Sequence, residues 1–175
     1  MNDEVLRYPI GKFTPKEAYT KQELSQCIQR IESLPSRIEG VIKNFSTKDL
    51  TATYRDGGWT ARQVIHHIAD SHTNAYIRLK WTLTEDTPVI KAYNEKLWAE
   101  TPEVKLDPAL SLNLLKALHA KWVILLKALT PGHLQMEYVH PDTKKNVRLD
   151  RMIAMYAWHG DHHLSHLKII AEKSN

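Results

Sequence analysis

Four stretches of the chain place apolar residues at steps of three and four, the repeat of an amphipathic α-helix. Each stretch has one apolar side that water disfavours, so each must pack against the others. The sequence therefore predicts an all-α helix bundle, and its length of 175 residues indicates one domain over residues 1–175. The predicted helices cover residues 20–45, 60–83, 107–129 and 149–170.

Local signals mark the ends of these helices. Thr60 and Gln63 have the spacing of a capping box, which predicts a helix start at this threonine. Asp107 followed by Pro108 is typical of an N-cap with proline in the first turn. Pro35 lies inside the first stretch, where a proline should kink the helix or split it in two.

The segments between the helices have weaker patterns. Residues 1–19 read as an extended arm over the surface, anchored by Tyr8, Ile10 and Phe13. Residues 85–106 form a long connection that either covers a pocket as a lid or fills surface. Residues 138–147 favour a short hairpin before the last helix.

Composition excludes several classes of protein. The net charge is +4, but the basic residues are spread singly, so we expect no nucleic-acid partner. The first residues lack the apolar stretch of a signal peptide, so we expect none, and we expect no membrane span, since no apolar run approaches ~20 residues. Cys27, the single cysteine, sits at an apolar helical position and is predicted to be a buried core thiol in a cytoplasmic protein.

Four of the ten histidines fall between His159 and His166 in the last helix. At ~100° per residue, His159 and His163 share the apolar face, whereas His162 is displaced to its edge. His166 is a candidate to support a ligand or to replace one. Two imidazoles four residues apart can hold one divalent metal, but they need a further ligand from elsewhere.

The second helix offers that ligand. His66 and His67 are neighbours, so one of them at most points to any given site. His67 lies at the margin of the apolar face and is the better candidate, while His66 falls towards the polar side. His119 borders the apolar face of the third helix and is either structural or a residue that orients a ligand.

Three histidines without a thiolate leave one coordination position for water or substrate, as in catalytic metal sites. Zinc suits imidazole ligands, and nickel can replace it. Burying an imidazole without a partner costs roughly 1–3 kcal/mol, which gives inward histidines a physical reason to coordinate a metal.

The stretches Gly57-Gly-Trp-Thr-Ala-Arg-Gln-Val-Ile-His-His-Ile-Ala-Asp70 and Tyr156-Ala-Trp-His-Gly-Asp-His-His163 resemble the two metal-binding motifs of the DinB/YfiT-like superfamily. The chain resembles its YfiT-type metal-dependent hydrolases of Bacillus-like bacteria nearly end to end. The resemblance implies an up-down four-helix bundle and a cytoplasmic homodimer acting on a small molecule. It also implies one divalent ion per subunit, held by His67, His159 and His163.

Three functions are compatible with this ligand set. In a hydrolase, the metal lowers the pKa of a bound water towards ~7. In the alternative, an S-transferase, it binds and deprotonates a small thiol such as bacillithiol, which the superfamily uses as a co-substrate. The second alternative is a metal-binding stress-response module without catalysis.

The sequence leaves the acid and base groups unassigned, because no glutamate follows the first histidine as in His-Glu-x-x-His. Asp70, one turn after His67, is a candidate to orient an imidazole, or else a solvated aspartate. Arg55 and Tyr93 are weak candidates to contact an anionic substrate.

Overall fold

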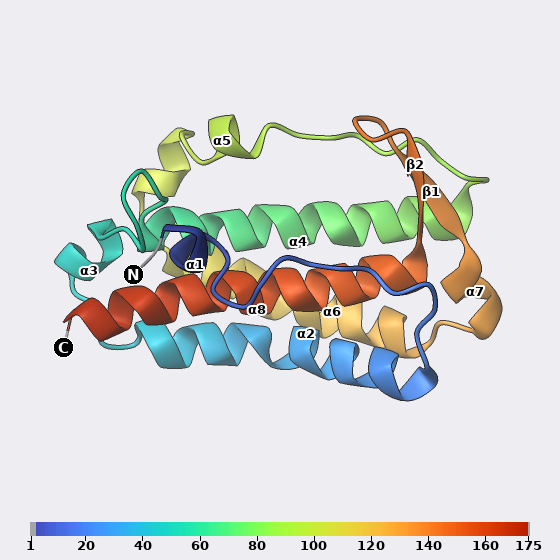
Figure 1. Ribbon diagram of the computed structural model, residues 1–175, viewed down its shortest axis with the longest axis horizontal. Coiled ribbons are helices and arrows are strands. Elements are labelled where there is room, and N and C mark those ends of the chain that lie inside the picture. The colour runs from blue at the N-terminus through green and yellow to red at the C-terminus, as the bar shows by residue number, and fades with distance from the viewer. Residues whose placement is uncertain (1–2, 175) are drawn as a thin grey trace.

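The computed structural model describes residues 3–174, and four long helices dominate it (Figure 1). This confirms the all-α four-helix bundle expected from the sequence. The four are α2 (Lys21–Ile42), α4 (Ala61–Thr84), α6 (Ala109–Lys127) and α8 (Leu149–Ser174). Short elements join them: α1 (Asp3–Arg7), α3 (Thr47–Thr51), α5 (Glu95–Trp98), the 3-10 turn η1 (Pro102–Lys105), α7 (Pro131–Gln135) and strands β1 (Glu137–His140) and β2 (Lys145–Arg148).

The four helices form the expected bundle, but their directions depart from strict up-down alternation between α4 and α6. Helix α8 packs on α2 and α4, and α6 packs on the same two helices from the other side. Figure 1 shows that α4 and α6 run in one direction and that α2 and α8 run in the other. The long segment 85–108 makes this possible, because it returns along the whole bundle before α6 begins.

Two apolar clusters fill the bundle, one towards each end. In every long helix, the members of one cluster occupy one end and the members of the other cluster the opposite end. On α4, for example, Ile68 belongs to one cluster and Ala75 to the other, with the fully buried His72 between them. Buried histidines of α4, α6 and α8 therefore form a polar layer between two apolar ones.

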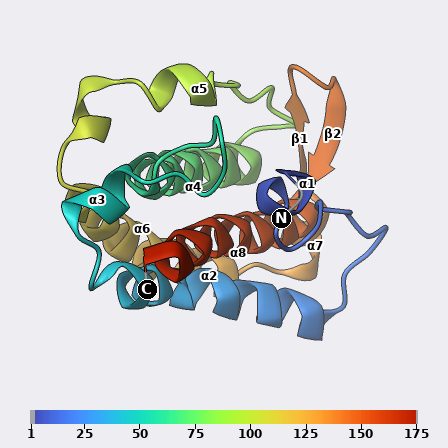
Figure 2. The ribbon, with the colours of Figure 1, turned by 60° about the vertical axis from the view of Figure 1, so that its left-hand side comes forward.

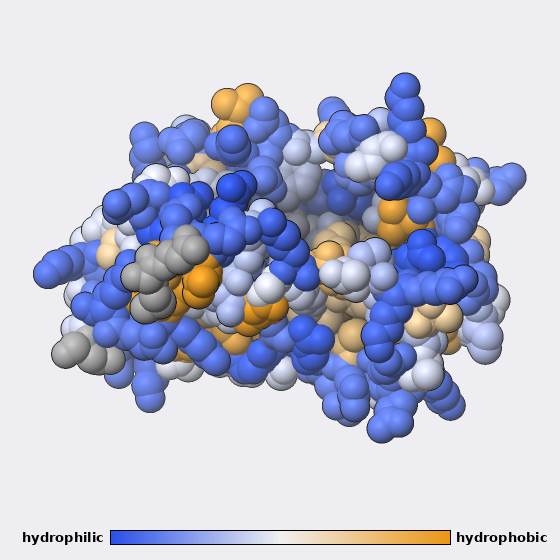
Figure 3. Space-filling view, in the orientation of Figure 1, coloured by the Kyte–Doolittle hydropathy of each residue, from blue (hydrophilic) through white to orange (hydrophobic). Residues whose placement is uncertain are grey.

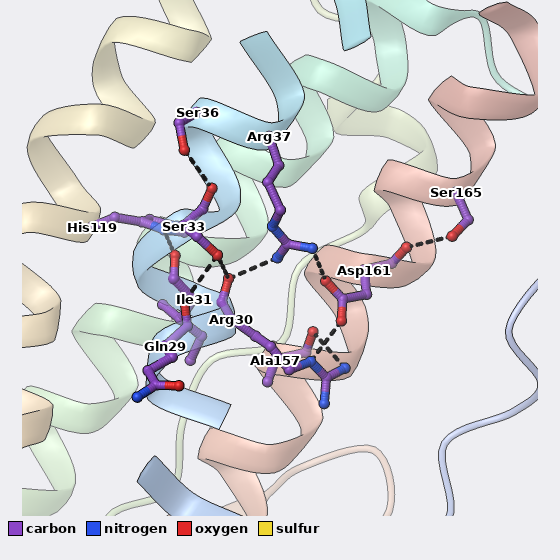
Figure 4. Close-up of polar contacts among 10 residues, drawn as sticks. All are labelled: Gln29, Arg30, Ile31, Ser33, Ser36, Arg37, His119, Ala157, Asp161 and Ser165. Carbon is purple, nitrogen blue, oxygen red and sulfur yellow. Dashed lines mark hydrogen bonds and ion pairs between the residues drawn. The ribbon is translucent and has the colours of Figure 1, made fainter. Parts of the chain in front are cut away.

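Helix α2 continues through Pro35 without a break, so the expectation that it might divide into two is wrong. Pro35 lacks the N–H that the Ile31 carbonyl would accept in a regular helix. Figure 4 shows the replacement: Nδ1 of His119, on α6, lies 2.6 Å from the Ile31 oxygen. The Ser33 and Ser36 hydroxyls donate to other carbonyls of the same turns. A side chain of α6 thus replaces the backbone hydrogen bond that Pro35 cannot make.

The face of α6 differs from the one predicted. The periodicity of this stretch predicts an inner stripe that includes Leu110, Leu114 and Leu115. Leu115 is buried as predicted, but Leu110 and Leu114 are exposed, and Leu112, which lies outside that stripe, is buried. By length and composition alone, α6 is long and apolar enough to cross a membrane, a test that the core helix of a soluble protein also passes. In the structure it is one of the four packed helices, and Trp122 on it is fully buried.

The N-terminal arm lies on the surface as expected, and the element under it is α8; it begins as a helix, α1, and is not extended throughout (Figures 1 and 2). The Trp158 indole donates to the Gly11 carbonyl at 3.2 Å, and Phe13 packs against the same ring. Ile10 is 43% exposed, so its expected role as an anchor is wrong.

The predicted hairpin is present, with Tyr138 paired to Val147 in antiparallel strands. The crossover segment, residues 85–108, is hydrogen-bonded to this hairpin, because Ile90 N–H donates to the Val139 carbonyl at 3.1 Å. Buried Arg78 on α4 holds the same segment by donating to the Lys91 carbonyl. Figure 3 shows a largely hydrophilic face with a hollow between the α5 segment and this hairpin.

A close approach of α2 and α8 gives a test of the packing. A Cβ added at Gly160 would lie 2.5 Å from Cδ2 of buried Leu34, whereas one added at Gly40 meets no described atom within 4 Å. Both glycines are helical, and alanine favours a helix by about 0.5–1 kcal/mol. Overpacking costs about 1–3 kcal/mol, so we expect Gly160→Ala to be less stable than Gly40→Ala by that amount in urea unfolding. The gap should close in a Leu34→Ala background, and equal stabilities in the native background would contradict the packing.

Candidate metal centre

Three imidazoles from two helices meet at one point inside the bundle. His67 comes from α4, and His159 and His163 come from successive turns of α8. One nitrogen of each lies within 4.8 Å of the others, and the Nε2 atoms of His67 and His159 are 3.2 Å apart. The fold therefore brings together the three histidines that the sequence proposes as ligands.

The spacing of the nitrogens suits a first-row divalent ion. Two imidazole nitrogens bound ~2.0–2.1 Å from a tetrahedral ion are about 3.3 Å apart, close to the 3.2 Å between His67 and His159. The group consists of imidazoles alone among the described residues. Such a set has the composition of a catalytic site with an open fourth position.

Burial keeps these imidazoles neutral. It lowers the pKa of His67 to about 4, with a smaller effect from His162. Burial, followed by the neighbouring imidazoles, lowers the pKa values of His159 and His163 well below the usual range. The neutral ring is the form that binds a metal, so the histidines need lose no proton to bind a metal at neutral pH.

Further histidines contact the triad or lie one contact away from it. Nδ1 of His159 lies 3.3 Å from Nε2 of His72, and Nδ1 of His72 lies 2.9 Å from Nε2 of His119. Sequence reasoning missed His72, although a signal exists: it falls between Ile68 and Ala75 in the middle of the apolar stripe of α4. A polar residue there must find a buried partner.

On the other side of the triad, His166 contacts His163, with their Nδ1 atoms 3.3 Å apart. Tyr54 stacks on the His166 ring at a centroid distance of 3.8 Å. His162, His163 and His166 also form a compact group, which overlaps the triad at His163. His162 itself lies outside the triad as expected, but it is buried and stacks on Trp158, so it is less peripheral than predicted.

A cavity of about 800 Å³ opens above the triad. Its floor is formed by His67, His159 and His163, and its walls include residues from α1, the 54–59 loop and α5. Trp59 contacts His67 at a ring distance of 4.5 Å. Small-molecule sites commonly enclose ~300–1,000 Å³, so the cavity has the size of a substrate pocket.

The three weaker candidates occupy different places. Arg55 lines the cavity, where Nη1 donates to the Asp56 carbonyl at 2.7 Å and lies 3.7 Å from Asp3. Tyr93 reaches the triad indirectly: its hydroxyl contacts Ser71, whose Oγ is 3.5 Å from His159 Nε2. Burial raises the Tyr93 pKa to about 12, so its hydroxyl keeps its proton.

Asp70 is half-buried and is not among the described residues that line the cavity. Burial, with a smaller effect from Glu103, raises its pKa to about 6. His66 was expected on the polar side, but it is buried and its Nδ1 lies 2.8 Å from Ser111 Oγ. It therefore belongs to the contact between α4 and α6, away from the triad.

The sequence pattern of the DinB superfamily matches residues 30–167 of the chain. YfiT of Bacillus subtilis (strain 168), named "Putative metal-dependent hydrolase YfiT", is 42% identical over 96% of this chain and 95% of its own. A relative with the same type of name in Bacillus cereus (strain AH820) is 47% identical over 100% of this chain and 99% of its own.

Solved structures agree with the fold. A structure of YfiT from Bacillus subtilis, described as "a probable metal-dependent hydrolase with an unusual four-helix bundle topology", superposes with a TM-score of 0.94. It covers 97% of this chain and 98% of its own, at 42% identity. A mycothiol-dependent maleylpyruvate isomerase superposes with a TM-score of 0.65 over 82% of this chain and 60% of its own. At 15% identity, that likeness concerns the fold alone.

The lowered pKa values predict a pH-dependent stability of the metal-free protein. Unfolding returns His67 from a pKa of about 4 to about 6.5, so the unfolded chain takes up protons first as the pH falls. The contribution of His67 to the free energy of unfolding should be constant above pH ~6.5. Between pH 6.5 and 4 the free energy of unfolding should fall, and each such histidine contributes up to about 1.4 kcal/mol per pH unit to this fall. Urea titrations in a chelator measure the slope, which should be shallower in His67→Gln. A flat profile in this window would contradict neutral buried rings.

The two overlapping histidine groups predict different metal-binding variants. If His67, His159 and His163 hold the ion, His67→Ala should weaken zinc or nickel binding more than ~100-fold, since even residues behind a ligand contribute 10–100-fold. His162→Ala is the matched control and should keep about one ion per chain. Metal analysis after dialysis and competition with a chromogenic chelator measure both. The reverse pattern would place the ion in the His162, His163 and His166 group instead.

Proposed function

The chain belongs to the DinB superfamily, and we propose that it is a metal-dependent hydrolase acting on a small molecule bound above His67, His159 and His163. One observation carries the proposal: a triad of neutral imidazoles forms the floor of a cavity of about 800 Å³. A closed structural site has no such access for substrate, whereas a catalytic site needs it.

A divalent ion in this triad, with zinc or nickel as candidates, would supply the Lewis acidity that makes a water nucleophilic near neutral pH. The chain's own residues would hold this ion and orient the substrate. His67, His159 and His163 provide the ligands, and Trp59 covers the His67 ring. Arg55, with Arg7 from the arm, places positive charge at the cavity wall, which favours a substrate with an anionic group.

The cavity walls also carry aromatic side chains. The arm just after α1 contributes Tyr8, the 54–59 loop contributes Tyr54, and α8 contributes Trp158. Aromatic walls bind the apolar part of a small molecule, while the arginines fix the orientation of its charged part. Tyr93 remains outside this wall, and we assign it an indirect role through Ser71.

The second candidate is a metal-dependent S-transferase that uses a low-molecular-weight thiol such as bacillithiol. The size of the cavity favours it, since about 800 Å³ is near the upper end of the ~300–1,000 Å³ range of small-molecule sites and gives room for a thiol and an electrophile together. Here the same ligands would activate the thiol in place of water.

The homodimer and the cytoplasmic location implied by the resemblance stay predictions. Exposed apolar side chains on α4 and α6 are available for a partner subunit: Ile77, Trp81, Leu110, Leu114 and Ile124. The absence of nucleic-acid and membrane partners stays an expectation from the charge and hydropathy patterns.

One experiment separates the candidate functions. The metal-loaded protein is incubated with a panel of ester and amide substrates, and with monochlorobimane in the presence and absence of a low-molecular-weight thiol. We expect turnover of an ester or amide without thiol, lost in EDTA, restored by zinc or nickel, and reduced at least ~100-fold in His159→Ala. Conjugation that requires thiol and His159 would replace the hydrolase with the transferase. Activity in neither assay, with metal still bound, would leave a binding module.

A further inference from the structure

The hydrogen bonds behind the triad form two chains, and each chain ends on a backbone carbonyl. One runs from His159 through His72 and His119 to the Ile31 oxygen, and the other runs from His163 through His166 to the Arg7 oxygen. A carbonyl accepts hydrogen bonds and never donates them. In each chain, the carbonyl therefore fixes which nitrogen of every histidine donates and which accepts.

In the first chain, His119 must carry its proton on Nδ1, because this atom lies 2.6 Å from the Ile31 oxygen. A neutral imidazole has one N–H, so His119 Nε2 is an acceptor and can bond only to a proton on Nδ1 of His72, 2.9 Å away. His72 Nε2 is then bare and accepts the Nδ1 proton of His159 at 3.3 Å. This leaves Nε2 of His159 without a proton.

The second chain follows the same reasoning. Nε2 of His166 lies 3.3 Å from the Arg7 carbonyl at the end of α1, so Nε2 carries the proton. Nδ1 of His166 is bare and accepts a proton from Nδ1 of His163, also at 3.3 Å. The nitrogen of His163 that remains for a metal is Nε2.

We infer that His72, His119 and His166 are positioning residues that fix the tautomers of His159 and His163, so that each presents a bare Nε2 to the metal. This inference rests on the ligand set of the proposed function, and it names the residues that orient two of those ligands. A partner that holds the second nitrogen of a ligand histidine sets both its tautomer and its ring orientation.

Pro35 has a part in this arrangement. Because Pro35 has no N–H, the Ile31 carbonyl lacks its regular partner four residues on in α2, and it receives the His119 proton instead. The polar layer between the two apolar clusters is thus connected to helix α2, which contributes no ligand of its own. His119 is nearly fully buried, as are His72 and His166, so water is a poor substitute for any of these bonds.

A direct test reads the tautomers of the metal-free, full-length protein by long-range proton–nitrogen NMR of its imidazoles. We expect protons on Nδ1 of His72, His119, His159 and His163, and on Nε2 of His166. A proton on Nε2 of His159 or His163 would overturn the inference. This readout needs neither metal nor activity.

A second test uses variants and metal affinity. We expect His72→Leu and His119→Leu to weaken zinc binding 10–100-fold in competition with a chromogenic chelator. His72→Gln and His119→Gln keep both a donor and an acceptor, and should restore much of the affinity. His66→Leu is the matched control, because His66 is a buried histidine on the same helix as His72 but bonds to Ser111. It should lower stability while leaving zinc affinity within ~3-fold, below the range expected for a residue behind a ligand.

The outcomes separate this inference from the proposed function. If the native protein binds zinc and the leucine variants bind it equally well, the positioning role is wrong while the metal site stands. If the native protein binds no metal, the proposed function fails, and NMR alone decides whether the tautomers are set as inferred. If a leucine variant does not fold, the glutamine variants and the native NMR spectrum still decide the question.

Discussion

The need to satisfy buried imidazole nitrogens shapes the middle of this bundle. A buried polar atom without a partner costs more than a hydrogen bond returns, so each ring in the two hydrogen-bonded chains constrains the next. The constraint passes from His159 to His72 and His119, and then to the backbone of α2. It explains why the apolar core is divided, and why a proline can lie inside α2 without breaking it. The same hydrogen bonds between imidazoles therefore hold the helices together and orient the candidate ligands.

Sequence periodicity predicted the four helices because it depends on local geometry alone. The capping box at Thr60 and the helix start at Leu149 are correct for the same reason. The inward face of α6 was harder, since nearly all sides of this helix carry leucine and only the packing partners decide which side is buried. Leu110 and Leu114 were assigned to the wrong side on that account. The parallel course of α4 and α6 depends on the crossover segment, which has no periodicity to interpret.

The candidate ligands were predictable because His159 and His163 recur on one face and His67 lies at the edge of another. The residues behind them were only partly predictable. His119 was recognised as a residue that might orient a ligand, but His72 was not considered, although a histidine in the middle of an apolar stripe calls for a buried partner. Asp70, one helical turn from His67, is half-buried and is not among the described residues that line the cavity, so its role in orienting an imidazole stays a prediction. The cavity walls come from loops and the arm, whose positions only the folded structure gives.

Helices α4 and α8, which carry the triad, are far apart along the chain: His67 and His159 are separated by 92 residues. Contacts of such long range cost chain entropy and are made after local helices have begun to form. A short metal-binding loop can gather an ion first and fold around it, but the proposed triad takes two ligands from α8 and the third from α4. The bundle must therefore assemble, with its imidazole layer in register, before there is a site to fill. On the proposed ligand set, an ion can therefore enter only once the bundle has assembled, and the cavity above the triad is the route open to it.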